Sequence, residues 1–308
     1  MSLMTVQCSV ELGIIYAITA LGVFLSFRTL NMPDLTVDGS FVLGAAVSAM
    51  LCSAGRPFSG LALALLAGCL AGCITALLHT GLKIQPLLAG ILNMLALYSI
   101  NLKVMANRAN IPLINKATVF SLLEWAPAAD YMQLIISLAI LLVILILLFF
   151  FLRTSLGLVL RATGDNEQMV RALGASTNYT KLAGLALSNG LVALSGALIA
   201  QYQSFADISM GIGMVIIGLA SVIIGEVIFG TKSLLRRLVA VVLGAVLYRL
   251  VIAFALELGM PPTDLKLISA VIVTLALSAS TIKERLVSFQ KRLSARQADW
   301  EYRSDVKN

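Results

Sequence analysis

Charged residues are scarce in this sequence: Asp, Glu, Lys and Arg make up 12% of its 308 residues, whereas soluble domains carry roughly 25%. Hydrophobic residues make up 59%. Apolar runs close to the roughly 20 residues needed to cross a bilayer recur along the whole chain. The shortage of charge therefore excludes an ordinary soluble domain and predicts an all-α polytopic membrane protein.

The residues that build common catalytic and metal sites are also scarce. The chain has one histidine, His79, and its four cysteines include one close pair, Cys69 and Cys73, inside an apolar run. A lone histidine makes neither a zinc site nor a catalytic triad, and cysteines in such a run are best interpreted as packing residues. No G-x-x-x-x-G-K-[ST] phosphate loop occurs, so the chain cannot hold ATP in that way. We therefore expect no enzyme activity, metal or cofactor in this chain.

The apolar runs predict eight or nine membrane spans, the second of them broken. The predicted spans cover residues 8–26, 41–55, 58–80, 85–105, 131–152, 182–201, 210–230, 237–257 and 267–282. Residues 27–40 contain Pro33, Gly39 and two aspartates, so we expect an interruption there and not a helix. Residues 1–282 would form the membrane domain, and residues 283–308 a basic cytoplasmic tail.

The basic residues are unevenly divided between the two sides of the membrane. Nine crossings would place the termini on opposite sides. Sixteen of the 22 Lys and Arg residues then fall on one side and five on the other, with Arg249 inside a span. The side richer in Lys and Arg is normally cytoplasmic, so we expect the N-terminus outside and the C-terminus in the cytoplasm. This asymmetry, with contact to anionic lipid, accounts for the net charge of +7 without a nucleic-acid partner.

The longest predicted cytoplasmic loop, residues 153–181, contains signals for a short helix. Asp165 and Asn166 are good N-cap residue types, and Gly174 is a natural stop at the C′ position. These signals predict a helix over residues 166–173.

This helix is predicted to be amphipathic. Met169, Val170 and Leu173 are expected to share one face, while Glu167, in the first turn, and Arg171 are spaced to pair at i,i+4. Such a helix can lie on the membrane surface, pack on its own protein or dock into a partner. An ordinary capped loop is the simplest alternative.

Two parts of the chain resemble the permeases of the branched-chain amino acid group of ABC importers. The stretch LRATGDNEQMVRALGASTNYTKLAGLALSNGLVALSGALIAQY, from Leu160, is similar to their cytoplasmic loop and following span. The stretch MPDLTVDGSFVLGAA, from Met32, resembles their broken second helix. Within the group, FRTLNMPDLTVDGSF, LLAGILNMLALYSINLKVM and GLASVIIGEVIFG are most similar to permeases described as taking up tryptophan and tyrosine. The resemblance covers nearly the whole chain except the basic tail.

The resemblance implies a set of partners and a direction of transport. ATP would be bound and hydrolysed by two separate ATPase subunits, with the helix at 166–173 as the coupling helix that fits into them. An external substrate-binding protein and a second permease copy would complete an importer in the bacterial plasma (inner) membrane. We expect a homodimer, with a heterodimer as the alternative. The solute would be small, with an aromatic amino acid favoured over a sugar, a nucleoside or another small solute.

Six polar residues in or near the spans are candidates for the solute pathway, because such residues are costly in lipid and are usually functional or paired. They are Asp34, Asp38, Asn93, Asn101, Glu226 and Arg249. Each has a structural alternative. The two aspartates could cap the helix expected to start near Gly39, and the two asparagines could link helices by hydrogen bonds.

The other two candidates lie on later spans. Glu226 is near the inner end of its span, where it could sit among headgroups or contact the ATPase. Arg249 is near the middle of its span and is expected to neutralise a buried carboxylate. Because Glu226 is shallow, Asp34 or Asp38 is the better expected partner.

Two other classes of membrane protein fit the sequence less well than an importer permease. An ion-coupled secondary transporter could use the same carboxylates, but such proteins usually show an internal repeat, and no convincing one is present. A membrane-embedded enzyme would need a catalytic constellation at helical spacing, which the sequence lacks. An ABC importer permease fits best.

Overall fold

The computed structural model describes residues 3–123 and 129–261, together with a few later positions. Those positions are Asp264, Leu267, Ser269, Ala270, Val271, Thr274 and Ser278. The predicted tail, residues 283–308, and most of the predicted ninth span, residues 267–282, lie outside the described residues.

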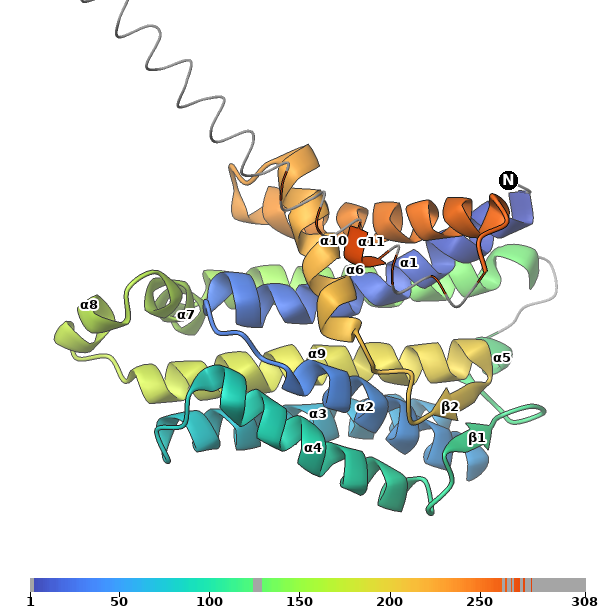
Figure 1. The fold of residues 1–308 in the computed structure, drawn as a ribbon, viewed down its shortest axis with the longest axis horizontal. Helices are drawn as coiled ribbons and strands as arrows, with labels where there is room; N and C mark the ends of the chain where they lie inside the picture. Colours follow the sequence, from blue (N-terminus) through green and yellow to red (C-terminus); the bar gives the residue numbers. More distant parts are fainter. Residues whose placement is uncertain are drawn as a thin grey trace, which may run out of the picture.

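The described chain is almost entirely helical (Figure 1). In chain order its elements are α1 (Leu3–Val23), η1 (Phe24–Thr29), α2 (Thr36–Ser53), α3 (Pro57–Thr80), α4 (Pro86–Val104), β1 (Asn110–Pro112), α5 (Val119–Leu122), α6 (Ala129–Arg153), α7 (Ser155–Asp165), α8 (Glu167–Ala172), α9 (Thr177–Gln203), β2 (Phe205–Asp207), α10 (Met214–Phe229) and α11 (Leu234–Glu257). The two strands pair antiparallel, with Ile111 opposite Ala206.

The helices match the predicted spans. Seven segments are long and apolar enough to cross a membrane: α1 with η1, α2, α3, α4, α6, α9 and α11. Helix α10, with 16 residues, is a shorter apolar helix. These eight correspond to the first eight predicted spans and confirm an all-α polytopic membrane protein.

The predicted interruption at residues 27–40 is shorter in the structure. Element η1 continues α1 as a π-helix to Thr29, and α2 already begins at Thr36, so only Leu30–Leu35 lie outside a helix. Pro33 lacks an N–H and cannot continue a helix from the preceding turn. The expectation of no helix was therefore wrong for residues 27–29 and 36–40, and right for residues 30–35.

Four other helix starts differ from the prediction by three to five residues. Helix α1 begins at Leu3 and not near residue 8, and α11 begins at Leu234 and not near residue 237. Helix α9 begins at Thr177 and not near residue 182, because its polar first turn lies outside the apolar stretch that hydropathy detects. Helix α10 begins at Met214 and not near residue 210. The residue before it, Gly213, has a left-handed φ of +89°, which a regular helix cannot include.

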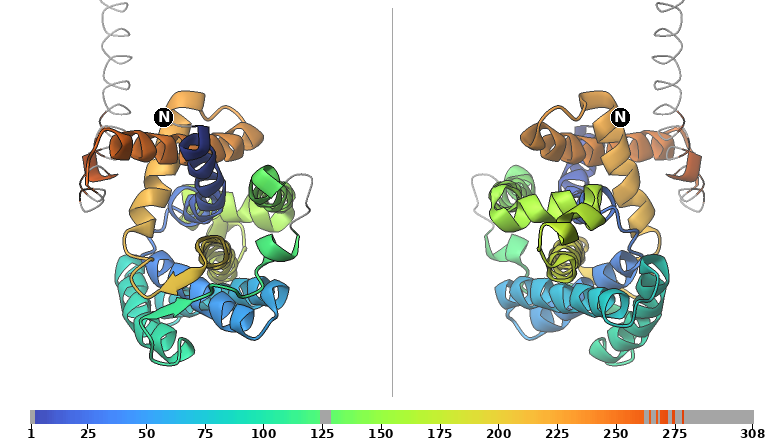
Figure 2. Two further views of the ribbon diagram at one scale, coloured as in Figure 1. Left: turned by 90° about the vertical axis from the view of Figure 1, so that its right-hand side faces the viewer. Right: turned by 90° about the vertical axis from the view of Figure 1, so that its left-hand side faces the viewer.

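Helix α9 lies at the centre of the molecule, with α2, α3 and α4 on one side and α1 and α11 on the other (Figures 1 and 2). Small residues allow the closest contacts. A Cβ on Gly44 would collide with the backbone of Ala193, and a Cβ on Gly72 with the backbone of Leu185. Close backbone approach of this kind is typical of helix packing in membranes.

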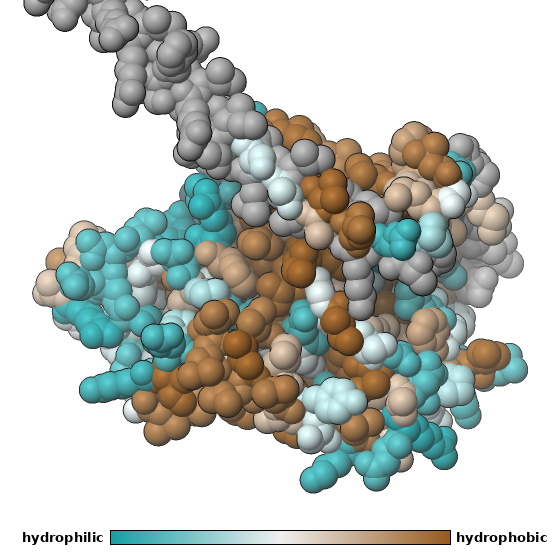
Figure 3. Space-filling model, viewed as in Figure 1, coloured by the Kyte–Doolittle hydropathy of each residue, from teal (hydrophilic) through white to brown (hydrophobic). Residues whose placement is uncertain are grey.

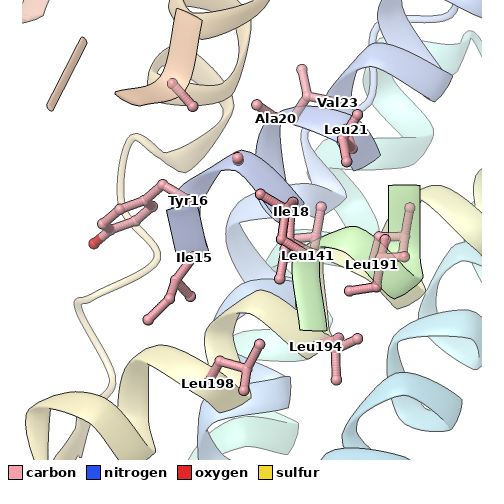
Figure 4. Packing of buried hydrophobic residues seen from close by; sticks show 14 of the residues in the cluster. Ile15, Tyr16, Ile18, Ala20, Leu21, Val23, Leu141, Leu191, Leu194 and Leu198 are labelled. Atoms are coloured by element: carbon pink, nitrogen blue, oxygen red, sulfur yellow. The ribbon is translucent and has the colours of Figure 1, made fainter. Parts of the chain in front are cut away.

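The main hydrophobic core lies where α1 meets α6 and α9. Figure 4 shows Ile18 and Leu21 of α1 near Leu141 of α6 and Leu191 of α9. All four side chains are buried. Other apolar side chains, including those on the outer faces of α3, α4 and α6, are exposed. Exposed leucines in such number are expected for helices that face lipid.

The two ends of the long axis are polar, and an apolar band separates them (Figure 3). One end carries α7 and α8, and we call it the α8 end. The other carries β1 and β2, and we call it the β end (Figure 1). The α8 end corresponds to the predicted cytoplasmic side.

Candidate functional site

A buried set of hydrogen bonds surrounds the break between η1 and α2. The carboxylate of Asp34, which is 1% exposed, accepts a hydrogen bond from the Nδ2 amide of Asn189 on α9 at 2.7 Å. Ser40 donates its hydroxyl to Oδ1 of the same Asn189 at 2.7 Å. The other oxygen of Asp34 accepts the N–H of Thr36 at 2.8 Å. Asp34 therefore supports the start of α2, as the structural alternative proposed, and also fastens the break to α9.

The same set of contacts extends to α3 and α4 through Thr36. Its hydroxyl lies 2.7 Å from the hydroxyl of Thr75 on α3. Asn93 of α4 donates its amide to the Thr75 hydroxyl and to the carbonyl oxygen of Ala71, both at 2.8 Å. Asn93 thus links α4 to α3, and a continuous chain of buried polar groups joins four helices.

Asp38 caps a helix far away in the sequence. Its two carboxylate oxygens accept the N–H groups of Gly213, at 3.0 Å, and of Val215, at 2.9 Å. These donors belong to the start of α10, where backbone N–H groups have no intrahelical partner and the helix dipole favours an anion. Asp38 therefore caps a helix, as the structural alternative predicted, but that helix is α10 and not α2.

Helices α2 and α10 both begin near the middle of the long axis (Figure 1). Each follows a non-helical stretch, Leu30–Leu35 before α2 and the segment after β2 before α10. Beside them, Asn101 of α4 donates its amide to the carbonyl oxygen of Gly39 at 3.1 Å. Its own amide oxygen is buried and accepts no hydrogen bond from any described residue. The structure therefore brings Asp34, Asp38, Asn93 and Asn101 into one region around the two helix starts.

Arg249 does not neutralise Asp34 or Asp38. Its guanidinium lies over the ring of Tyr16 on α1, 4.1 Å from the ring centroid. Tyr16 in turn stacks with Phe41 of α2. The expected ion pair was wrong because an aromatic ring on a neighbouring helix satisfies the cation by its negative face, and the sequence gives no sign of which ring that is.

Glu226 joins a separate group of contacts at the α8 end. Its carboxylate lies 3.0 Å from Nε of Arg28, at the end of η1, and 4.0 Å from Nε of Arg237 on α11. The residue therefore ties three elements together near the inner end of its span, as its position in the sequence suggested. Neither Glu226 nor Arg249 joins the hydrogen bonds around Asp34.

The predicted helix at 166–173 is present as α8, with six residues. Asn166 is its N-cap, and its side-chain oxygen accepts the N–H of Met169 at 3.0 Å. Asp165 is the last residue of α7 and does not cap α8. The expectation for Asn166 is confirmed, and that for Asp165 was wrong because a second helix, α7, runs directly into the cap.

The end of α8 has the predicted glycine stop. Gly174 has φ +81°, and its N–H donates to the carbonyl oxygen of Arg171 at 3.0 Å. The N–H of Ala175 donates to the carbonyl oxygen of Val170 at 3.2 Å. Together these two bonds form the Schellman arrangement that ends many helices.

The apolar residues of α8 do not share one face. Val170 is 3% exposed and packs into the protein, whereas Met169 is 51% exposed and Leu173 is 76% exposed. Successive side chains on a helix point about 100° apart. Met169 and Leu173, four residues apart, therefore point in similar directions, whereas Val170 points to one side of them and is buried. Val170 anchors α8, and Met169 and Leu173 are presented to the outside.

A charged contact that the sequence did not reveal holds α8 in place. Glu167 pairs with Arg171 at 2.6 Å, as predicted, and also with Lys181 of α9 at 2.7 Å. Nζ of Lys181 lies 3.2 Å from Nε2 of His79, whose Nδ1 lies 2.8 Å from the carbonyl oxygen of Ile84. Partial burial disfavours the ionised form of Glu167, but the hydrogen bond and charge of Lys181, followed by those of Arg171, outweigh it and lower its pKa. His79, which the sequence left without a role, therefore helps to position α8.

A cavity of about 620 Å³ opens beside this contact at the α8 end. Its lining includes the charged residues Lys83, Glu167, Arg171 and Lys181 and also His79. Within residues 3–123 and 129–261, no three His, Cys, Asp or Glu side chains come together as a metal site would require. The geometry thus contains a buried polar centre around two helix starts and a projecting helix fastened at the α8 end.

Comparisons with known proteins identify a family of transport permeases. Residues 9–277 match the family described as the permease component of branched-chain amino acid transport systems. The chain is 39% identical over 282 residues to the tyrosine transport system permease protein of Clostridioides difficile (strain R20291), covering 91% of this chain and 93% of that one. It is 36% identical over 275 residues to an uncharacterized protein of Rickettsia prowazekii (strain Madrid E), covering 88% and 96%. No solved structure matches the chain.

Proposed function

Because the chain belongs to the family of permease components of branched-chain amino acid transport systems, we propose that it conducts an amino acid, with an aromatic one favoured, into the cytoplasm. It is a multi-pass inner-membrane protein and the permease component of an ABC-type transport system.

The observation that carries the proposal is the buried polar centre around the starts of α2 and α10. Free backbone groups and half-helix ends near the middle of the membrane are typical of solute sites in transporters. The carboxylates of Asp34 and Asp38 are acceptors that suit the ammonium group of an amino acid. So is the amide oxygen of Asn101, to which no described residue donates.

The contact between Asp38 and α10 supports a gating role for these elements. Asp38 stands on α2 and accepts two hydrogen bonds from the start of α10. If α10 moves relative to α2, this cap breaks, and the carboxylate becomes available to a solute in the opened space. The cap would then re-form as the solute leaves.

Helix α8 supports coupling to two separate ATPase subunits. It is held to its own protein by Val170 and by the Glu167–Lys181 pair, while Met169 and Leu173 project outward. A short helix that is fixed on one side and apolar on the other can transmit a push from a partner cleft to α9. We further propose a permease homodimer with an external substrate-binding protein.

The aromatic preference rests on the Clostridioides difficile relative, which is named a tyrosine transport system permease protein. Selectivity in such importers depends largely on the external binding protein. Identifying the ligand of the external binding protein is therefore the most informative single measurement of which solute this permease conducts.

The test is uptake by proteoliposomes that contain this permease, its ATPase and its binding protein. We expect ATP-dependent uptake of labelled tyrosine or tryptophan that does not change when the proton gradient is collapsed. Substituting Asp34→Asn and Asp38→Asn should reduce uptake while the ATPase remains bound. Uptake that needs a proton gradient and no ATP would contradict the proposal and favour a secondary transporter. Normal uptake by a stably folded double variant would remove both aspartates from the pathway.

A further inference from the structure

A second cavity, of about 520 Å³, lies at the α8 end between η1, α7 and the start of α11. We call it the η1–α7–α11 cavity. Its charged lining consists of Arg28, Arg161, Asp165, Lys232 and Arg237. Four cations from four parts of the chain thus face one space with a single carboxylate among them.

The positive charge is not balanced by the neighbouring acids that the structure describes. Glu226 is adjacent and pairs with Arg28 at 3.0 Å, and it lies 4.0 Å from Arg237. When Asp165 and Glu226 are both counted against the four cations, two positive charges remain. Like charges held together in a partly desolvated space repel one another, so an anion that enters the cavity would be bound.

Two of these cations also have unused hydrogen-bond donors. The Nε atoms of Arg161 and Arg237 are buried, and neither donates to any residue that the structure describes. Buried donors without a partner are rare in folded proteins and call for an explanation. A guanidinium group matches the geometry of phosphate oxygens, to which it can donate two parallel hydrogen bonds.

Apolar side chains also line the cavity, beside the hydroxyl residues Thr29, Thr231 and Ser233, and they indicate where the anion comes from. Phe24, Leu158 and Leu234 line the same cavity, and Leu158 is 52% exposed. Helix α7, which carries Leu158, directly follows α6, which is long and apolar enough to cross a membrane, so α7 would begin at the membrane surface. Basic pockets next to membrane helices on the cytoplasmic side are suited to lipid headgroups.

We propose that the η1–α7–α11 cavity binds a phosphate group, supplied by the headgroup of an anionic phospholipid. Free phosphate shares the chemistry of the charged part, and the apolar lining favours the lipid. The bound headgroup would connect η1 and α11 to α7, which leads directly into α8. Lipid at this site would therefore steady the position of the projecting helix.

The experiment measures thermal stability of the purified permease in detergent as phosphatidylglycerol, phosphatidylcholine or inorganic phosphate is added. We expect a saturable rise in Tm with phosphatidylglycerol and not with phosphatidylcholine, weakened by salt. The variant Arg161→Gln, alone or with Arg237→Gln, should raise the half-saturating phosphatidylglycerol concentration by about tenfold or more, since charge-assisted hydrogen bonds are lost.

The matched control is Arg153→Gln. Arg153 is also an arginine at the α8 end, but it lies over the ring of Phe149, 5.4 Å from the centroid, and does not line the cavity. It should respond to phosphatidylglycerol like the unmodified protein. The Arg161→Gln variant should keep its Tm in phosphatidylcholine, which shows that it folds.

Each outcome decides the proposal. Inorganic phosphate could stabilise the permease as much as phosphatidylglycerol does, with the effect lost in Arg161→Gln. That result would support a phosphate site and overturn the assignment of its phosphate to a lipid headgroup. Equal stabilisation by both phospholipids, or an equal response of Arg161→Gln and Arg153→Gln, would overturn it. An acidic segment of the ATPase that stabilises the permease through Arg161 in the absence of any phosphate response would also overturn it.

Discussion

Replacing Leu173 by aspartate tests whether α8 docks into an ATPase. Leu173 is 76% exposed and has little burial to lose in the permease itself. An exposed substitution of this kind usually changes stability by less than about 0.5 kcal/mol. The free energy of unfolding of the permease should therefore be nearly unchanged.

The effect on the complex should be much larger. Burying a whole leucine side chain stabilises by about 1.5–3 kcal/mol, so the exposed three quarters of Leu173 would contribute about 1–2 kcal/mol on docking. An unpaired carboxylate placed in the same cleft adds a desolvation cost of about 2 kcal/mol or more. Together these weaken ATPase binding by at least about 3 kcal/mol, roughly a hundredfold.

The assay is ATPase binding to the purified permease and ATP hydrolysis by the complex. Two variants separate the possible causes of a loss. Ile114→Asp changes a similarly exposed residue, 72% exposed, outside α7 and α8, and should leave ATPase binding unchanged. Val170→Asp changes a residue that is 3% exposed and should instead loosen α8 on its own protein. Full ATPase retention and full stimulated hydrolysis by the Leu173→Asp permease would show that α8 is only a capped loop.

Three further predictions concern the contacts around the two helices. Asp38→Ala should destabilise the permease by about 1–2 kcal/mol, because the start of α10 loses both of its acceptors. Thermal unfolding checks this, and Asp38→Asn, which keeps one acceptor, should lie between the two. Gly174→Val should cost about 1–2 kcal/mol, since φ +81° disfavours a β-branched residue although there is space for the side chain. Gly174→Asn should cost less, and equal losses would mean that the left-handed conformation is not the cause. The pKa of Glu167 is lowered in the folded protein, so its contacts stabilise α8 above the usual glutamate pKa of about 4.3 and are lost as pH falls below that value. Hydrogen exchange of α8 should therefore speed up between about pH 5 and pH 3 beyond the intrinsic trend, and Glu167→Gln should abolish this change. An unchanged pH response in Glu167→Gln would assign it to another group.

Features that depend on neighbouring residues could be predicted from the sequence. The spans follow from apolar runs of sufficient length, and the end of α8 follows from Gly174, whose left-handed φ needs no distant partner. The cap by Asn166 and the pair between Glu167 and Arg171 involve residues three and four apart. A helix places such residues side by side whatever the rest of the chain does.

Features that depend on distant residues were decided only by the tertiary structure. Asp38 caps a helix that starts more than 170 residues later, and Arg249 finds the ring of Tyr16 on the first helix. Likewise, only the tertiary structure buries Val170 and brings Lys181 to His79. A carboxylate, a cation or a lone histidine has many possible partners of suitable chemistry, and the sequence shows which groups need one. The crossing of the helices determines which partner lies within hydrogen-bonding distance.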